Sequence, residues 1–243
     1  MEQAKHYSRS PIVEARIEIK VKLSPEMEVT NLMQIASAIE SEYEIEHQYF
    51  NINGQITVDS DLVVSASANH DPVGYSFFAE DKQRRIQARL DGFTFSQFKP
   101  YSGWKKLQET AQNLWDIYKK ITDPIDIESI SLRYVNRIEL PDANLSLKDY
   151  FTTFPEISPS LSQTSGTQIL HLQVPIEEVD SIAHITQARV QQQLFVILDI
   201  NIITQGIISI QVEDIWAKLD LIHQNSDKIF ETFITNKTRE SIQ

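Results

Sequence analysis

The feature that most constrains the fold is a strict alternation of apolar and charged side chains over residues 11–23, PIVEARIEIKVKL. The apolar members are Val13, Ala15, Ile17, Ile19, Val21 and Leu23, and the charged members are Glu14, Arg16, Glu18, Lys20 and Lys22. A period of two over more than ten residues predicts a β-strand with one apolar and one charged face. The apolar face has to be buried in a sheet that packs against another layer.

The rest of the chain alternates between helical and strand-like patterns. Apolar residues at helical spacing follow at 29–39, and a long amphipathic helix is predicted from Trp104 to Tyr118. Further strands are expected over residues 45–69 (with Asn53-Gly54 as a hairpin turn), 73–79, 84–90, 93–98, 127–140, 167–176, 181–190 and 194–204. A short helix at 145–151 and a closing helix at 211–235 complete the pattern.

Each half of the chain therefore repeats the order strand, helix, several strands, long helix. We predict an α+β fold of two pseudo-repeated halves, each a mainly antiparallel sheet packed by a short helix and a long amphipathic helix. The boundary near Asp123-Pro124 gives halves 1–123 and 124–243, packed as one compact unit. The two sheets could merge or stand side by side. The Pro- and Ser-rich loop at 155–166 is long enough to indicate mobility or binding.

Composition excludes several classes of protein. The chain has 243 residues, no cysteine and a net charge of −12, so disulfides, thiolate zinc sites and a cysteine nucleophile are excluded. The acidic balance opposes nucleic-acid phosphate at long range, and nucleic acid is not expected as a partner. No apolar run approaches the 18 residues of a membrane span, and the charged N-terminus lacks a signal-peptide pattern, so we expect a cytoplasmic protein.

Motifs of known chemistry are missing from the sequence. With six glycines there is neither a GxGxxG nor a GxxxxGK[ST] loop, and HExxH, GxSxG and calcium-loop motifs are absent. The six histidines are scattered, and no two stand four residues apart. We therefore predict no cofactor, no metal site and no catalytic residue.

The candidate site is the charged face of the predicted sheet. Its members are Glu14, Arg16, Glu18, Lys20, Arg85, Arg89, Arg133, Arg137 and Glu139. Arginine forks bind phosphate or carboxylate bidentately, and carboxylates can hold a magnesium ion. The first strand weakly resembles the Glu-x-Glu-x-Lys strand of triphosphate tunnel enzymes, but Arg16 stands where the first glutamate would be. The same residues also fit a solvated face of cross-strand ion pairs, which is the simpler interpretation.

Three further features have a structural and a functional interpretation, and packing is favoured for each. His223 falls on the apolar stripe of the last helix, as a buried and hydrogen-bonded histidine would. Asn136 lies on the apolar face of its strand, where it could fix register or close a polar pocket. The aromatic cluster Phe93, Phe95, Phe98, Tyr101 and Trp104 fits core packing better than a base-stacking platform.

Four segments together resemble an uncharacterised family of bacteria and archaea known only as a sporadically distributed protein. They are SPIVEARIEI (10–19), FSQFKPYSGWKKL (95–107), SLRYVNRIELP (131–141) and LIHQNSDKIFETFITNKTRES (221–241). The resemblance spans nearly the whole chain and implies no activity, substrate or site residue. The family's patchy distribution implies horizontal transfer, which suits an accessory system of the defence or toxin-neutralisation type.

Three hypotheses follow. The leading one is a non-catalytic interaction protein that binds another protein, or a second copy of itself, in such a system. The first alternative is a ligand-binding module that recognises a phosphate- or carboxylate-bearing small molecule through the arginine-lined face. The second alternative is a metal-dependent triphosphate or phosphoester enzyme that uses Glu14, Glu18, Lys20 and Glu139.

Overall fold

The chain folds around one large antiparallel sheet. A computed structural model describes residues 7–39, 42–58, 64–142, 145–155, 167–189, 193–206 and 213–243, with side chains described except at 45–58, 64–71 and 213–214. The nine strands are β1 (Ile12–Lys22), β2 (Tyr43–Val58), β3 (Val64–Ala79), β4 (Arg84–Arg89), β5 (Gly92–Phe98), β6 (Asp126–Glu139), β7 (Gln168–Ile176), β8 (Ser181–Arg189) and β9 (Phe195–Thr204). Their order across the sheet is β2-β3-β4-β5-β1-β6-β9-β8-β7. The predicted α+β class with a mainly antiparallel sheet is confirmed, and the sheet is continuous across Asp123-Pro124.

The alternating strand β1 lies at the centre of the sheet. It pairs antiparallel with β5 on one side and with β6 on the other. Its residues Ala15, Ile17 and Ile19 are fully buried, because they face the helices, while the charged residues between them face away. The alternation read from the sequence therefore separates the two faces as predicted.

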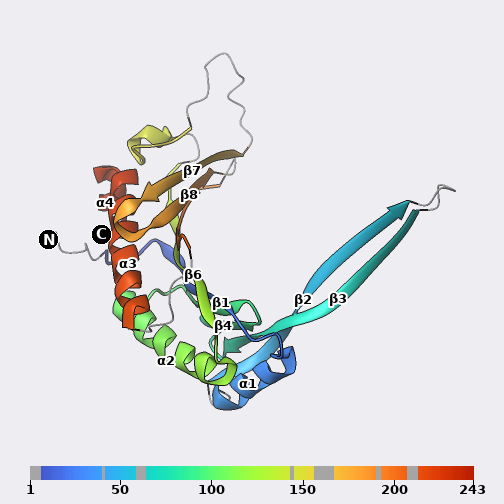
Figure 1. Ribbon diagram of the computed structural model, residues 1–243. Helices are drawn as coiled ribbons and strands as arrows, with labels where there is room; N and C mark the ends of the chain where they lie inside the picture. Colours follow the sequence, from blue (N-terminus) through green and yellow to red (C-terminus); the bar gives the residue numbers. More distant parts are fainter. Residues whose placement is uncertain are drawn as a thin grey trace.

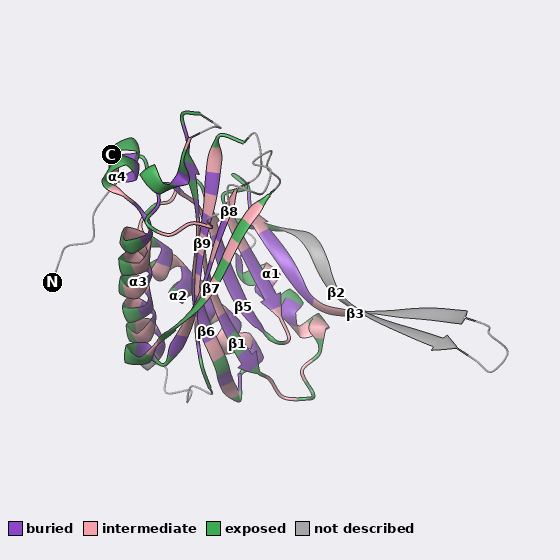
Figure 2. Ribbon diagram, turned by 90° about the horizontal axis from the view of Figure 1, so that it is seen from above, coloured by how far each residue is buried: buried purple, intermediate pink, exposed green. Residues whose placement is uncertain are grey.

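All the long helices cover one face of the sheet (Figures 1 and 2). The helices are α1 (Met33–Ile39), α2 (Trp104–Thr122), α3 (Glu213–Phe233) and α4 (Asn236–Ile242), with 3₁₀ turns at Val29–Leu32, Leu147–Asp149 and Glu177–Val179. On α2, Trp115 and Tyr118 contact Phe93 of β5, with ring centroids 5.9 and 5.8 Å apart. In the part of the chain that is described, no helix has the length and apolarity needed to cross a membrane.

The packing of α2 and α3 differs in part from the sequence prediction. The apolar positions of the two helix patterns predict that Trp104, Leu107, Leu114, Trp115, Trp216, Leu219 and Phe230 are mostly buried. Leu107, Leu114, Trp115 and Leu219 are buried, but Trp104, Trp216 and Phe230 are only partly buried. Trp104 contacts the other predicted half of the chain, since its indole N–H donates to Asp220 Oδ1 on α3 at 2.7 Å. The two long helices thus contact each other across the boundary between the predicted halves.

The predicted turn at Asn53-Gly54 is wrong. Strand β2 continues through these residues, which pair with Asn69 and Ala68 of β3, and the chain reverses between Val58 and Val64, outside the described residues. Asparagine followed by glycine favours a turn locally, but a long strand pairing overrides that preference. A tight turn also joins β4 to β5, and Gly92, the first residue of β5, has a φ of +154°. A Cβ there would stand 2.5 Å from the carbonyl oxygen of Ile19, so glycine allows β5 to start close to β1.

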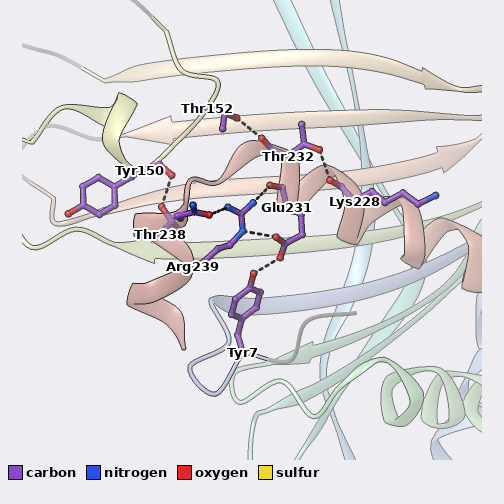
Figure 3. Close-up of polar contacts among 9 residues, drawn as sticks. Tyr7, Tyr150, Thr152, Lys228, Glu231, Thr232, Thr238 and Arg239 are labelled. Carbon is purple, nitrogen blue, oxygen red and sulfur yellow. Dashed lines mark hydrogen bonds and ion pairs between the residues drawn. The ribbon is translucent and has the colours of Figure 1, made fainter. Parts of the chain in front are cut away.

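Residues near the two ends of the chain meet at Glu231 of α3 (Figure 3). Arg239 on α4 donates from Nε to the Glu231 carboxylate at 2.8 Å and from a terminal nitrogen to the Glu231 carbonyl at 2.7 Å. The hydroxyl of Tyr7 donates to the other carboxylate oxygen of Glu231. Helix α4 lies just after the predicted closing helix, and neither α4 nor this network was anticipated, although Glu231 and Arg239 belong to the last of the four resembling segments.

Candidate functional site

A row of polar side chains crosses the face of the sheet that the helices leave open. Adjacent strands place Arg85 (β4) opposite Ser96 (β5), Ser96 opposite Arg16 (β1), and Arg16 opposite Arg133 (β6). The row continues from Arg133 to Asn201 (β9) and on to His184 (β8). Neighbouring strands lie about 4.8 Å apart, so three arginines lie within four adjacent strands. We call Arg85, Ser96, Arg16, Arg133, Asn201 and His184 the arginine row.

Carboxylates flank the arginine row and neutralise some of its charge. Asp199 accepts two hydrogen bonds from Arg133, at 2.8 and 2.6 Å, and these bonds raise the pKa of the Arg133 guanidinium above its ordinary value. Glu18 accepts a hydrogen bond from Arg89 at 2.7 Å. Glu14 lies 3.9 Å from Arg85 and accepts a hydrogen bond from the buried Ser96 hydroxyl.

Arg16 is the one arginine of this face without a carboxylate partner in the described part of the chain. Its Nε is buried and makes no hydrogen bond there, and neither does the Nε of Arg85. Arg16 also lies opposite Arg133, and like charges in directly opposed cross-strand positions destabilise a sheet. Four arginines (16, 85, 89 and 133) thus face four carboxylates (14, 18, 91 and 199), because Arg89 also donates to Asp91 at 2.8 Å. The charges of this group balance in number, but Arg89 has two of the carboxylates as partners and Arg16 has none of them.

Arg85 is held in place by aromatic rings. Its guanidinium carbon lies 5.7 Å from the ring centroid of Phe78 and 5.4 Å from that of Phe98. Stacking of this kind orients a planar guanidinium without using its N–H donors. Phe98 therefore belongs to the charged face, whereas Phe93, Phe95, Tyr101 and Trp104 pack in or against the core as predicted.

The structure brings together six of the nine predicted site residues: Glu14, Arg16, Glu18, Arg85, Arg89 and Arg133. Lys20 lies on the same face but at an exposed position further along β1, opposite Gly92 and Ser129. Arg137 and Glu139 lie further along β6, where they pair with each other at 2.9 Å, and Arg137 stacks 4.0 Å from the ring centroid of Phe195. Glu139 is thus four residues along β6 from Val135, the residue opposite Glu14.

Sequence reasoning missed the contribution of β9 and its neighbours. Asp199 and Asn201 are the polar residues of an otherwise apolar stretch, FVILDINII, and stand two residues apart. That spacing placed both on one face of a strand and could have identified them. Ser96 and His184 carry no such signal, since only the register of the strands brings them into the arginine row.

No group of three or more histidine, aspartate or glutamate side chains that could hold a metal ion occurs among the residues with described positions. Glu14 and Glu18, the predicted metal ligands, point to the arginine-rich part of the face and contact Arg85 and Arg89.

His223 lies on the opposite, helix-covered face. Its ring stacks on Trp104 with centroids 4.6 Å apart, and its Nδ1 is 3.1 Å from the Tyr134 hydroxyl. Burial lowers the pKa of His223 to about 4, and burial likewise raises the pKa of Asp227, whose carboxylate is 3.6 Å from Nε2, to about 6. Because burial disfavours the charged form of each group, we assign a neutral imidazole at neutral pH. The prediction of a packed, hydrogen-bonded histidine agrees with this arrangement, and Asn136 is likewise buried and donates to the Leu198 carbonyl at 3.1 Å.

Comparisons with known proteins assign no family to this arrangement. No protein-family model matches the chain, and no curated protein matches it either. The family resemblance based on the four segments therefore stays a prediction, and the function has to be argued from the arginine row itself.

Proposed function

We propose that the protein is a ligand-binding module that holds a small polyanion, with phosphate or carboxylate groups, against the arginine row. The observation that carries the proposal is the pair Arg16 and Arg133, which lie opposite each other while only Arg133 has a carboxylate partner in the described chain. An anion between the two guanidinium groups would convert a repulsive pair into charge-assisted hydrogen bonds.

Phosphate and carboxylate groups fit the free donors of the row. Arg16 and Arg85 each present a buried Nε–H without an acceptor, and planar guanidinium forks match these anions bidentately. Arg85 and Arg16 are separated by the width of two strand spacings, or about 10 Å. We propose a ligand with two or three linked anionic groups, because it spans this backbone separation more readily than a single phosphate does.

The predicted repeat gives this proposal a structural rationale. The first strands of the two halves, β1 and β6, form the central pair, and Arg16 and Arg133 are opposed residues within it. On one side of that pair the arginine row continues with Ser96 of β5 and Arg85 of β4. On the other side it continues with Asn201 of β9 and His184 of β8. We propose that the halves are pseudo-repeats whose equivalent positions together form one anion site.

Thermal stability in the presence of inorganic tripolyphosphate tests the proposal. A ligand that binds only the native state at a hundred times its Kd stabilises it by about 2.7 kcal/mol. For a chain of this size that corresponds to a rise in Tm of roughly 5–10 °C. The Arg16→Met variant should lose most of the rise, and the rise should shrink as salt increases.

The matched control is Arg137→Gln. Arg137 is an arginine of the same sheet face, but it is paired with Glu139 and stacked on Phe195, outside the arginine row. This variant should keep the full rise in Tm. Equal responses of the wild-type, Arg16→Met and Arg137→Gln proteins would show binding by general charge and reject the proposed site.

A second candidate function, binding of a partner protein, is favoured by the edge strand β7. This strand ends the sheet, and its Ile169 and Val174 side chains are 63% and 40% exposed. Exposed apolar residues on an unpaired edge are where a further strand adds to a sheet. Sedimentation of the wild-type and Ile169→Lys proteins tests self-association through this edge. A monomer in both cases would remove a second copy of the chain as the partner.

A further inference from the structure

A cavity of about 460 Å³ lies on the helix-covered side of the sheet, away from the arginine row. It is bordered by α1, α2 and residues around the starts of β2 and β4 and along β5, and it is open to solvent on one side. Its volume falls within the range of about 300–1,000 Å³ that is typical of small-molecule sites.

The cavity has an apolar wall. Ile39 of α1, Phe95 of β5, and Leu114 and Ile117 of α2 line it, and the first three are buried in the core. These side chains provide a surface for an aliphatic or aromatic group, and burial of such a group would supply most of the affinity.

Tyr43 lines the same cavity, and its hydroxyl lacks a hydrogen-bond partner among the described residues. Tyr43 is only 5% exposed, and no described residue accepts from or donates to its hydroxyl. Burial raises the pKa of Tyr43, so the hydroxyl stays protonated and can donate. A buried polar group without a partner in a native protein calls for an explanation, and a missing ligand is one.

Charges of both signs line the cavity. Arg84 and Glu42 form an ion pair at 3.2 Å and offset each other. Lys106 on α2 has no carboxylate partner in the described chain, and Asp81 accepts a hydrogen bond only from the backbone N–H of Gln83 there. The cavity therefore offers one cation and one anion that are free to pair with a ligand.

We propose that this cavity binds a zwitterion with an apolar side chain, that is, a free hydrophobic α-amino acid. Lys106 pairs with its carboxylate, Asp81 pairs with its ammonium group, and the apolar wall receives its side chain. The Tyr43 hydroxyl donates to a carboxylate oxygen. This site is independent of the proposed polyanion site, because the two lie on opposite faces of the sheet.

Isothermal titration calorimetry with three probes tests the proposal: L-phenylalanine, N-acetyl-L-phenylalanine and L-phenylalaninamide. The first has both charges, the second lacks the ammonium group, and the third lacks the carboxylate. L-Phenylalanine should bind most tightly. Loss of either charge should weaken binding by about fivefold, the amount expected for one partly exposed ion pair.

Substitutions of two exposed residues test the carboxylate and the ammonium group of the ligand separately. Lys106→Gln should weaken binding of L-phenylalanine and of the N-acetyl compound but leave the amide unchanged. Asp81→Asn should weaken binding of L-phenylalanine and of the amide but leave the N-acetyl compound unchanged. Both residues are exposed, so neither change should prevent folding. Arg16→Met, on the other face, should change none of the three affinities.

Tyr43→Phe supplies a separate readout. It removes a hydroxyl that has no hydrogen-bond partner among the described residues, so the Tm of the free protein should stay the same or rise while the affinity for L-phenylalanine falls. The proposal is overturned if L-phenylalanine does not bind, if all three probes bind equally, or if Lys106→Gln and Asp81→Asn affect the same probes. Loss of L-phenylalanine binding in Arg16→Met would also overturn it, without bearing on whether tripolyphosphate binds.

Discussion

Arg16 lies directly opposite Arg133 in the central strand pair, yet only Arg133 has a carboxylate partner in the described chain. The two arginines therefore have different energetic roles, although both belong to the same row. Arg133 is part of an ion pair with Asp199, whereas the Arg16 Nε–H has no acceptor among the described residues, and we propose that a ligand supplies one.

The first prediction compares Arg133 with Arg137. Arg133→Gln should lower the free energy of unfolding by about 1.5–3 kcal/mol, because two charge-assisted hydrogen bonds are lost and Asp199 stays partly buried without its partner. Arg137→Gln should cost less than about 1 kcal/mol, since the pair Arg137–Glu139 is largely exposed. Urea unfolding of both variants measures the two values. A cost for Arg137 equal to that for Arg133 would contradict the assignment of Asp199 as a specific partner.

The second prediction concerns His223 and pH. Its folded pKa of about 4 lies below the ordinary value of about 6.5, so the unfolded chain binds the proton more tightly. The stability that neutral His223 contributes is then complete above about pH 6.5 and is lost as the pH falls toward 4. Asp227, with its pKa raised to about 6, has the opposite effect between pH 6 and 4, because its protonated form is favoured in the folded protein.

The His223→Gln variant separates the effect of His223 from the effect of the other titrating groups, including Asp227. The difference in free energy of unfolding between the wild-type protein and His223→Gln should shrink as the pH is lowered from 7 to 4. NMR titration of the His223 ring should give a pKa below 5. A difference that grows on acidification would instead show a charged imidazole paired with Asp227.

The third prediction concerns the junction of the chain ends. Arg239→Met should destabilise the protein by about 2–3 kcal/mol, because the Glu231 carboxylate and carbonyl lose their charge-assisted bonds while Glu231 remains partly buried. Exposed Lys237, two residues before Arg239 in the same helix, supplies the control, and Lys237→Met should cost less than about 1 kcal/mol. Thermal unfolding of both variants checks the comparison. Equal costs would mean that the network in Figure 3 adds no more stability than a surface contact.

The sequence carries enough information for the elements of this fold but not for their order in the sheet. Alternation in residues 11–23 and helical spacing from Trp104 onward are local patterns, and both give correct elements close to the observed bounds. The position of β1 between β5 and β6 depends on pairings between residues more than 70 positions apart, such as Ile17 with Phe95. No local pattern encodes such pairings. The error at Asn53-Gly54 has a different cause, because there the turn preference of two residues is overridden by the long pairing of β2 with β3.

The candidate site was predictable in composition and not in arrangement. The alternation placed Arg16, Arg85 and Arg133 on the same side of their strands. It could not show that Arg16 and Arg133 would be opposed, because that depends on the antiparallel register of β1 and β6. The two-residue spacing of Arg137 and Glu139 puts them on one face of β6, but it could not show that they would pair with each other and not with the other predicted residues.

The central claim is that Arg16 is retained for a ligand and not for the fold, and unfolding of Arg16→Met with and without tripolyphosphate tests it most directly. Without ligand, the variant should be as stable as the wild-type protein or more stable by about 0.2–1 kcal/mol, because a like-charge cross-strand pair is removed. With ligand, it should gain little of the stability that the wild-type protein gains. Destabilisation of the free variant by several kcal/mol, or an undiminished gain with tripolyphosphate, would contradict the claim.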